Sequence, residues 1–230
     1  MNVRLINESG GGNLMRMFAG LLAAVALSAW ASSGSIQNQE PMTFFVTSDG
    51  PGNGGDLGGL AGADALCQRL GAAVGRGNAT WRAYLSQAPG AGAERVDARD
   101  RIGSGPWHNA KGDLIAANLA DLHEDRNNVR KYTALNERGE EVQGRGDSPN
   151  RHDILTGSDS MGRLFDTNAG VSTCNNWTSG GDDHTARLGH HDRLGGANAS
   201  WNSVHTSRGC SQSALEGTGG DGLIYCFAAD

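Results

Sequence analysis

The sequence predicts an α+β fold for an exported domain, with short twisted strands, two helices, long loops and two disulfides. Four cysteines lie after the first quarter of the chain, at Cys67, Cys174, Cys210 and Cys226, and an apolar segment of the export-signal type precedes them. Glycine contributes 36 of the 230 residues, more than twice its usual share. This composition favours irregular loops that covalent links hold in place over a regular layered enzyme.

The N-terminal segment has the three parts of a cleavable export signal. Arg16 precedes an uncharged apolar run over residues 18–30, and the small-x-small pattern that signal peptidase accepts ends at Ala31. The alternative is a transmembrane anchor, which needs about 20 apolar residues, and this run is shorter. We therefore expect a signal peptide that is removed on export.

The chain then divides into a signal peptide over residues 1–31, a polar linker over residues 32–41 and one folded domain over residues 42–230. We expect this domain in the periplasm, on the cell surface or secreted, as a monomer that does not insert into the membrane after signal cleavage. Removal of the signal takes away two arginines and one glutamate, so the formal charge changes from -6 to about -7. Nucleic acids, heparin and anionic membranes select basic surfaces, so we expect none of them as partners.

The cysteines themselves fit an oxidising compartment, where disulfides form and persist. Four cysteines allow three pairings. A zinc site is disfavoured because no CxxC pair exists and the spacings match no zinc module.

The first half of the domain contains three periodic segments. A β-rich run over residues 43–47 predicts a strand that a glycine-containing turn ends at residues 49–52. An amphipathic helix with a buried cysteine is predicted by apolar residues at three- and four-residue steps, namely Leu60, Ala63, Cys67, Leu70 and Val74. Trp81, Ala83 and Leu85 alternate with other residues, which predicts a strand with Trp81 in the core.

The second half predicts shorter elements. A second helix is expected to begin at Asp113, a good N-cap residue, and to run through Ile115, Leu119 and Leu122. Short strands between long loops are expected at residues 131–136, 141–143, 154–156, 173–178 and 222–228.

A collinear series of motifs runs through these elements. It consists of Cys67, Trp-Arg-Ala-Tyr-Leu-Ser at 81–86, Ala-Arg-Asp-Arg-Ile at 98–102, Gly-Pro-Trp at 105–107, Thr-Gly-Ser-Asp-Ser-Met-Gly-Arg-Leu at 156–164, Cys-Asn-Asn-Trp at 174–177, Cys210, and Leu-Ile-Tyr-Cys at 223–226. Over roughly residues 42–230 the chain resembles the endostatin domain that ends collagens of types fifteen and eighteen. It resembles even more the endostatin-like domains of secreted and outer-surface bacterial proteins, whose start is similar to residues 58–68.

The resemblance implies a C-type-lectin-like fold with nested disulfides, Cys67–Cys226 and Cys174–Cys210, which is also the pairing that we favour among the three. It further implies a binding protein without catalysis, since endostatin is a binding protein and bacterial relatives are associated with matrix and complement-regulatory proteins. The acidic charge departs from the heparin-binding arginines of endostatin. Residues 31–60 contain no histidine, so the zinc site of endostatin is not expected either.

The hexapeptide Gly-Arg-Gly-Asp-Ser-Pro at residues 144–149 is the adhesion sequence that integrins recognise. A glycine-permitted turn lets Arg145 and Asp147 project on opposite sides of Gly146, so that the carboxylate completes a receptor metal site while the guanidinium pairs with an acidic pocket. The alternative is a solvated loop, because a bare Arg-Gly-Asp arises by chance in glycine-rich chains. Arg145, Gly146 and Asp147 are the first candidate binding residues.

Trp201 and Asn202 are further candidate binding residues, because polar neighbours favour a loop surface for this tryptophan. Calcium-dependent lectins hold their ion with several oxygen ligands, including a Trp-Asn-Asp motif. Here the motif is Trp201-Asn202-Ser203, which lacks the carboxylate. Calcium-dependent glycan binding is therefore an alternative function.

A run of acidic residues and histidines carries another alternative, a metal-dependent envelope hydrolase that uses the His190 region. The run consists of Asp182, Asp183, His184, His190, His191, Asp192 and His205. Because adjacent residues on a strand face opposite sides and no HExxH motif is present, surface loop histidines are the simpler interpretation.

Taken together, these patterns predict a non-enzymatic, adhesion-type protein that binds an extracellular protein or glycan. We expect the loops after Gly139 and between Cys174 and Cys210 to form the contact surface. We expect no catalytic residue, no metal site and no cofactor.

Overall fold

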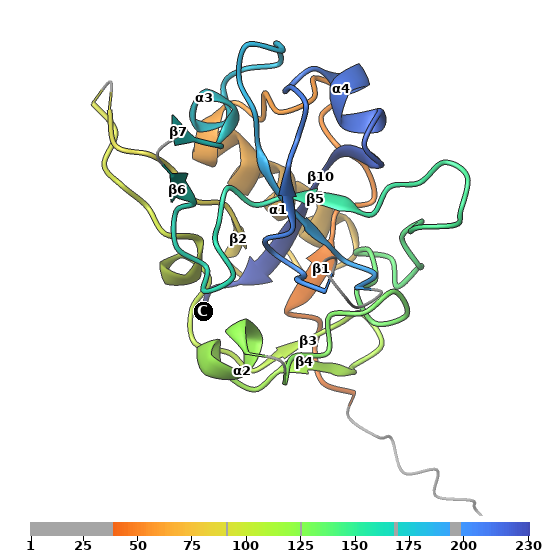
Figure 1. Cartoon of the computed structure of the whole chain (residues 1–230). Coiled ribbons are helices and arrows are strands. Elements are labelled where there is room, and N and C mark those ends of the chain that lie inside the picture. The colour runs from red at the N-terminus through yellow and green to blue at the C-terminus, as the bar shows by residue number, and fades with distance from the viewer. Residues whose placement is uncertain (1–38, 91, 125, 168–169, 194–198) are drawn as a thin grey trace, which may run out of the picture. The chain divides into compact units, whose positions relative to one another are not determined.

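A nine-residue strand, β10 (Gly220–Ala228), is the central strand of the main sheet in the computed structural model (Figure 1). One edge of β10 pairs antiparallel with β1 (Phe44–Val46). The other edge pairs in parallel with β5 (Asp153–Leu155) and then antiparallel with β2 (Trp81–Ala83). Beyond β5 follow β8 (Arg187–His190) and β9 (His205–Thr206), each antiparallel to its neighbour.

The structure describes residues 39–230 except residues 91, 125, 168–169 and 194–198, and a compact unit spans residues 38–230. The expected signal peptide and most of the expected linker lie outside the described residues. Across the described residues, no helix has both the length and the apolar character that a membrane crossing requires.

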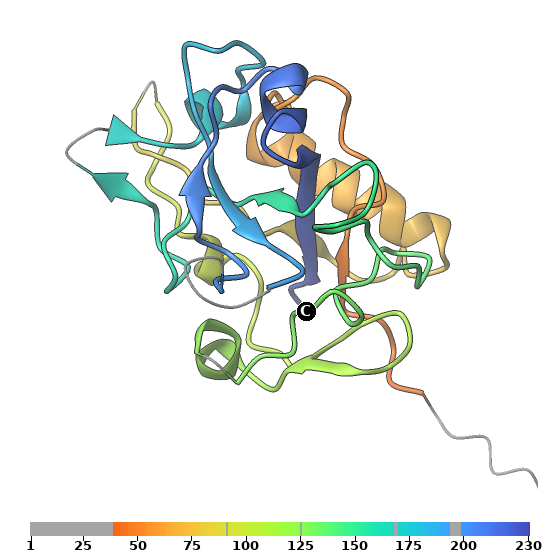
Figure 2. The ribbon, with the colours of Figure 1, turned by 45° about the vertical axis from the view of Figure 1, so that its right-hand side comes forward.

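Alternation along β10 produces two apolar clusters on opposite faces of the sheet. Ile224, Cys226 and Ala228 belong to the cluster that includes α1 (Gly59–Ala73), which lies beside β2 and β10 (Figure 2). Leu223, Tyr225 and Phe227 belong to the second cluster, which also holds Trp107 and Trp201. Each face of β10 is therefore covered, which explains why this strand is apolar almost throughout.

Two disulfides join these parts, and their pairing is the nested one that we favoured. The outer disulfide, Cys67–Cys226, links α1 to β10 and spans 159 residues. The inner disulfide, Cys174–Cys210, spans 36 residues. The α+β class, the short strands and the two disulfides are confirmed. Trp81 lies in the core as expected, and so do Trp107 and Trp177, each at most 1 % exposed.

The expected helix from Asp113 is wrong at its start. Residues around Asp113 instead form a two-stranded sheet of β3 (Trp107–His108) and β4 (Leu114–Ala116). Helix α2 (Leu119–His123) begins later, because the Asn118 side chain accepts a hydrogen bond from the backbone N–H of Asp121 at 3.0 Å. Asn118 therefore supplies the N-cap that we had assigned to Asp113.

The strand expected over residues 173–178 is also wrong. A short helical turn, α3 (Cys174–Trp177), takes its place, and its four residues have positive φ angles between 47° and 66°. Two of the four are asparagines, which tolerate this left-handed conformation better than most residues. The Asn176 amide also exchanges hydrogen bonds with the backbone of Ala88 at 2.8 and 2.9 Å, which holds the turn in place.

The remaining elements are short. They are a 3-10 helix η1 (Ala98–Asp100), a hairpin of β6 (Asp166–Thr167) and β7 (Gly170–Val171), and helix α4 (Gln212–Glu216). The described residues thus contain four α-helices where two were expected. The strands expected at residues 131–136 and 141–143 are reduced to isolated bridges, Val46 with Asn136 and Leu135 with Glu141.

Candidate functional site

The adhesion tripeptide lies in an exposed turn. The backbone N–H of Asp147 donates to the carbonyl of Gly144 at 3.0 Å, which closes the turn. Gly146 has a φ of 95°, a conformation that favours glycine. Arg145, Gly146 and Asp147 are all exposed, and within the described part of the chain the Arg145 guanidinium makes no hydrogen bond or ion pair.

The Asp147 carboxylate, in contrast, has two partners. Its Oδ2 accepts hydrogen bonds from Lys131 Nζ at 2.6 Å and from the backbone N–H of Gly144 at 2.8 Å. The hydrogen bond from Lys131 is the main reason why the pKa of Asp147 lies below its usual value. About a third of the side chain is exposed, at 36 %, so a binding partner would meet this carboxylate already engaged.

A buried aspartate fixes the base of the turn. Asp192 Oδ2 accepts a hydrogen bond from the backbone N–H of Arg145 at 2.7 Å, and Asp192 Oδ1 lies 3.3 Å from His152 Nδ1. Burial would raise the pKa of Asp192, but these two hydrogen bonds outweigh it and hold the pKa well below its usual value. A side chain at Gly144 would place its Cβ 2.7 Å from Asp192 Oδ2, so only glycine allows this approach.

His191, the residue before Asp192, contacts the same loop. Its Nε2 lies 3.2 Å from the carbonyl of Gln143, and because a carbonyl only accepts, Nε2 carries the proton. The ring is fully buried, and burial lowers its pKa to about 4. The backbone on both sides of Gly144 is therefore tied to residues 191 and 192.

Next to Asp192 the sheet gathers four residues that we call the histidine cluster, His152, Asp153, His190 and His205. Asp153 of β5 is the direct cross-strand partner of His190 on β8. His205 of β9 is opposite Leu188, two residues from His190, so it lies on the same face as its diagonal neighbour. His152 precedes β5, and its ring stacks on that of His190 with centroids 4.0 Å apart.

Three imidazoles of the histidine cluster surround one carboxylate oxygen. Asp153 Oδ1 lies 2.9 Å from His190 Nε2, 3.3 Å from His152 Nε2 and 3.4 Å from His205 Nε2. Asp153 and His190 are buried, whereas 37 % of the His205 side chain is exposed. The cluster is thus accessible from the His205 side.

The Asp153 carboxylate is held by proximity rather than by directed hydrogen bonds. Both of its oxygens are buried, and neither accepts a hydrogen bond of acceptable geometry, although the nitrogens are close enough. Burial opposes ionisation, yet the neighbouring imidazoles lower the pKa of Asp153 to about 2. Reciprocally, the pKa of His205 is raised, chiefly by Asp153.

The histidines expected as surface loop residues are therefore divided. His184 lies at the surface as expected, with 42 % of its side chain accessible and Asp183 at 3.5 Å. For His190 and His191 the expectation is wrong, because both side chains lie within the folded sheet region. Sequence reasoning missed His152 and Asp153 altogether. Their only local signal is their position just before an apolar β-run, which does not indicate its pairing with β8.

The expectation that Trp201 reaches a loop surface is also wrong. Trp201 and Asn202 are 2 % and 1 % exposed and border a cavity of only about 180 Å³. Trp201 Nε1 donates to the carbonyl of Leu122 at 3.0 Å. The Asn202 amide donates to the Tyr84 hydroxyl at 2.9 Å, so its polar atoms complete the core rather than face a ligand. The ring at position 201 is held among Tyr84, Tyr225 and other core aromatics, which is why it does not reach the surface.

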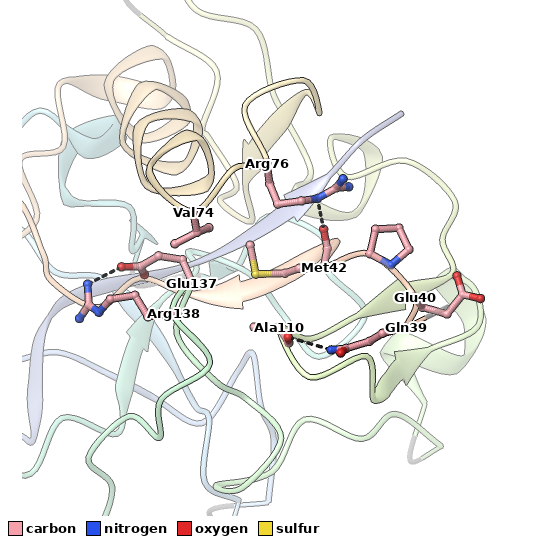
Figure 3. A pocket seen from close by; sticks show the side chains of 9 residues that line it. Gln39, Glu40, Met42, Val74, Arg76, Ala110, Glu137 and Arg138 are labelled. Carbon is pink, nitrogen blue, oxygen red and sulfur yellow. Dashed lines mark hydrogen bonds and ion pairs between the residues drawn. The ribbon is translucent and has the colours of Figure 1, made fainter. Parts of the chain in front are cut away.

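A larger cavity of about 480 Å³ lies beside Met42 and Val74 (Figure 3). Apart from Glu40, the polar side chains drawn there are engaged with one another or with the backbone. Arg76 Nε donates to the carbonyl of Met42 at 3.1 Å, and Arg138 pairs with Glu137 at 2.7 Å. No set of unengaged polar groups among the described lining residues converges there, so this cavity does not define a ligand.

Comparison with models of known protein families and with curated proteins finds no match to this chain. The assignment of function therefore rests on the exposed turn and the histidine cluster.

Proposed function

We propose that this protein is an exported, non-enzymatic ligand-binding protein that presents the turn at Arg145, Gly146 and Asp147 to an extracellular protein partner. The observation that carries the proposal is the exposed turn whose backbone is fixed from below by the buried carboxylate of Asp192. We further propose that the domain belongs to the endostatin-like proteins and has their C-type-lectin-like fold. The α+β class and the nested disulfides support that assignment.

The chemistry of the turn suits a partner that offers both a metal ion and an acidic pocket. The Arg145 guanidinium, which has no partner among the described residues, is available to a carboxylate, with which it can form two parallel hydrogen bonds. The Asp147 carboxylate, two residues further along, can complete the coordination of a divalent cation on the receptor. A fixed turn also lowers the conformational entropy that is lost on binding.

Lys131 competes with the receptor for the Asp147 carboxylate. The Lys131–Asp147 pair is partly exposed to solvent, and such pairs are weak because water and salt screen them. Displacing Lys131 therefore reduces affinity by a few-fold at most. Removal of the lysine side chain should increase affinity for an integrin-type receptor, which a coincidental tripeptide sequence would not do.

The test is binding of the oxidised protein to integrin ectodomains in buffer with Mg²⁺, measured by biolayer interferometry. We expect Asp147→Ala and Asp147→Glu to abolish binding and Lys131→Ala to strengthen it. Asp183→Ala is the matched control, because Asp183 is an exposed aspartate on a different loop with 78 % of its side chain accessible. Absence of binding, or binding that Asp147→Ala leaves intact, would refute the proposal.

Binding of glycans has lost its structural support. The residues that suggested it, Trp201 and Asn202, are buried with their polar groups engaged by protein. The same experiment, repeated on a glycan array with and without chelator, would detect such binding if it uses other residues.

A further inference from the structure

The hydrogen-bond partners of the histidine cluster fix the tautomers of two rings. His205 Nδ1 lies 3.3 Å from the carbonyl of Thr206, which can only accept, so Nδ1 carries the proton. His152 Nδ1 faces the ionised carboxylate of Asp192 at 3.3 Å and carries a proton for the same reason. In the neutral rings, the remaining Nε2 atoms therefore hold lone pairs.

These lone pairs lie close to a carboxylate oxygen of Asp153, which is itself an acceptor. His205 Nε2 and His152 Nε2 lie 3.4 and 3.3 Å from Asp153 Oδ1, and His190 Nε2 lies 2.9 Å from the same oxygen. The Asp153 oxygens are buried and accept no hydrogen bond of acceptable geometry. Lone pairs and a carboxylate at this distance repel one another unless a cation lies among them. A buried carboxylate of this kind needs such a cation.

The distances match those around a tetrahedral metal ion. With metal–ligand bonds of about 2.0–2.1 Å, the edges of a tetrahedron of ligands are about 3.3 Å long. His190 Nε2, His205 Nε2 and Asp153 Oδ1 form a triangle with sides of 2.9, 3.1 and 3.4 Å. The donor atoms of His152, Asp153 and His190 also lie within 4.8 Å of one another. No metal ion is needed to place these residues, because strand register already brings three of them together.

The donor set selects the kind of ion. Imidazole nitrogens with one carboxylate suit Zn²⁺ and its first-row neighbours, whereas Ca²⁺ and Mg²⁺ require oxygen ligands. The contact of His205 Nδ1 with the carbonyl of Thr206 is the kind of hydrogen bond that usually orients a ligating histidine. We propose that the histidine cluster binds one divalent transition-metal ion of the zinc type through His190, His205 and Asp153, with the fourth position open to solvent. The ring of His152 stacks on that of His190 and supports this ligand instead of binding the ion. The half-exposed His205 leaves a route of entry for the ion.

The experiment is titration of chelator-stripped, oxidised full-length protein with Zn²⁺, followed by calorimetry and by metal analysis after dialysis. We expect one ion per chain, and we expect Co²⁺ in place of zinc to give the intense visible absorption bands of tetrahedral coordination. Removing one ligand should weaken zinc binding by about 100-fold or more, since losing even a group that only hydrogen-bonds to a ligand costs about 10- to 100-fold.

Two variants and a control show whether zinc binds at the histidine cluster. His190→Ala removes a buried ligand, and His205→Ala removes a half-exposed one that the fold can lose more easily. The matched control is His184→Ala, which removes an exposed histidine outside the cluster and should leave zinc affinity unchanged. Circular dichroism checks that each variant is folded. Stoichiometric zinc that is lost in the folded His205→Ala protein supports the site. Absence of zinc binding, or zinc binding that survives both cluster variants, would overturn the proposed metal site. Protons on the imidazoles would then be the cations that balance the Asp153 carboxylate.

Discussion

Replacement of Asp192 by Asn tests whether a buried carboxylate holds the adhesion turn. The carboxylate contacts the backbone N–H of Arg145 at 2.7 Å and His152 Nδ1 at 3.3 Å, and both of these groups are donors. An asparagine keeps one acceptor oxygen, but its amino group then faces the other donor. Hydrogen bonds to charged groups contribute about 1.5–3 kcal/mol each, so the loss of one predicts about 2–3 kcal/mol lower stability for the oxidised protein in urea unfolding. The side chain is only 1 % exposed, so solvent does not reduce this value much.

The same substitution should loosen the turn locally. A loss of about 2 kcal/mol at the Arg145 hydrogen bond corresponds to about 30-fold faster amide hydrogen exchange of Arg145. Amides in α1 should change only to the extent that global stability falls. Asp183→Asn is the control, because that aspartate is exposed and far less constrained. If the Arg145 amide exchanges at the same rate in Asp192→Asn as in the unmodified protein, then Asp192 does not hold the turn and the reasoning is refuted.

Three further outcomes can be measured by urea unfolding. Burial lowers the pKa of His123 below 6.5, and its ring accepts from the Tyr84 hydroxyl at 2.8 Å, so only the unfolded state binds a proton near that pH. The free energy of unfolding should therefore fall as pH drops below 6.5, and His123→Gln should flatten this dependence. Equal slopes of the free energy of unfolding against pH in both proteins would argue against this role of His123. Trp201→Ala should cost about 3–5 kcal/mol, whereas Tyr132→Ala, at a residue 69 % exposed, should cost under about 0.5 kcal/mol. Loss of the outer disulfide should reduce stability by at most about 5 kcal/mol and loss of the inner one by at most about 4 kcal/mol. The outer disulfide counts for more because it closes a loop of 159 residues, whereas the inner one closes a loop of 36. The reverse order of the two losses would contradict this loop-entropy account.

Local patterns predicted the elements whose environment is simple. The helix with Cys67 on its buried face and the strand with Trp81 in the core follow from periodicity, because one side of each faces the same apolar cluster. The prediction of a helix from Asp113 was wrong because the chain offers two residues that can serve as its N-cap. Asn109 Oδ1 accepts a hydrogen bond from the backbone N–H of Asp113, and the backbone N–H of Asn109 donates to the Asp113 carbonyl. The helix therefore begins after Asn118, which is its N-cap. Periodicity alone does not reveal which cap prevails.

The candidate site was less predictable, because its residues meet through long-range strand pairing. The sequence marked His190 and His205, but Asp153 becomes their neighbour only when β5 pairs with β8. The tripeptide turn was visible from its own sequence, since glycine and proline indicate a loop. Its connection to Asp192, 47 residues away from Arg145, was not. A motif can thus be located locally, whereas the groups that hold it are set by the tertiary fold.

The two ends of the tripeptide are held with different strength, and this difference suits a recognition loop. The backbone of Arg145 is bound by a buried carboxylate, where the low local dielectric strengthens the contact. The side chain of Asp147 is bound by a partly exposed lysine, where water and salt weaken the contact. The turn therefore keeps its shape before a partner arrives, which spares the cost of ordering it, while the carboxylate that must reach the partner is the group that is most easily released. A turn whose carboxylate was buried and whose backbone was loose would have the opposite properties, and would be a poor ligand despite the same six-residue sequence.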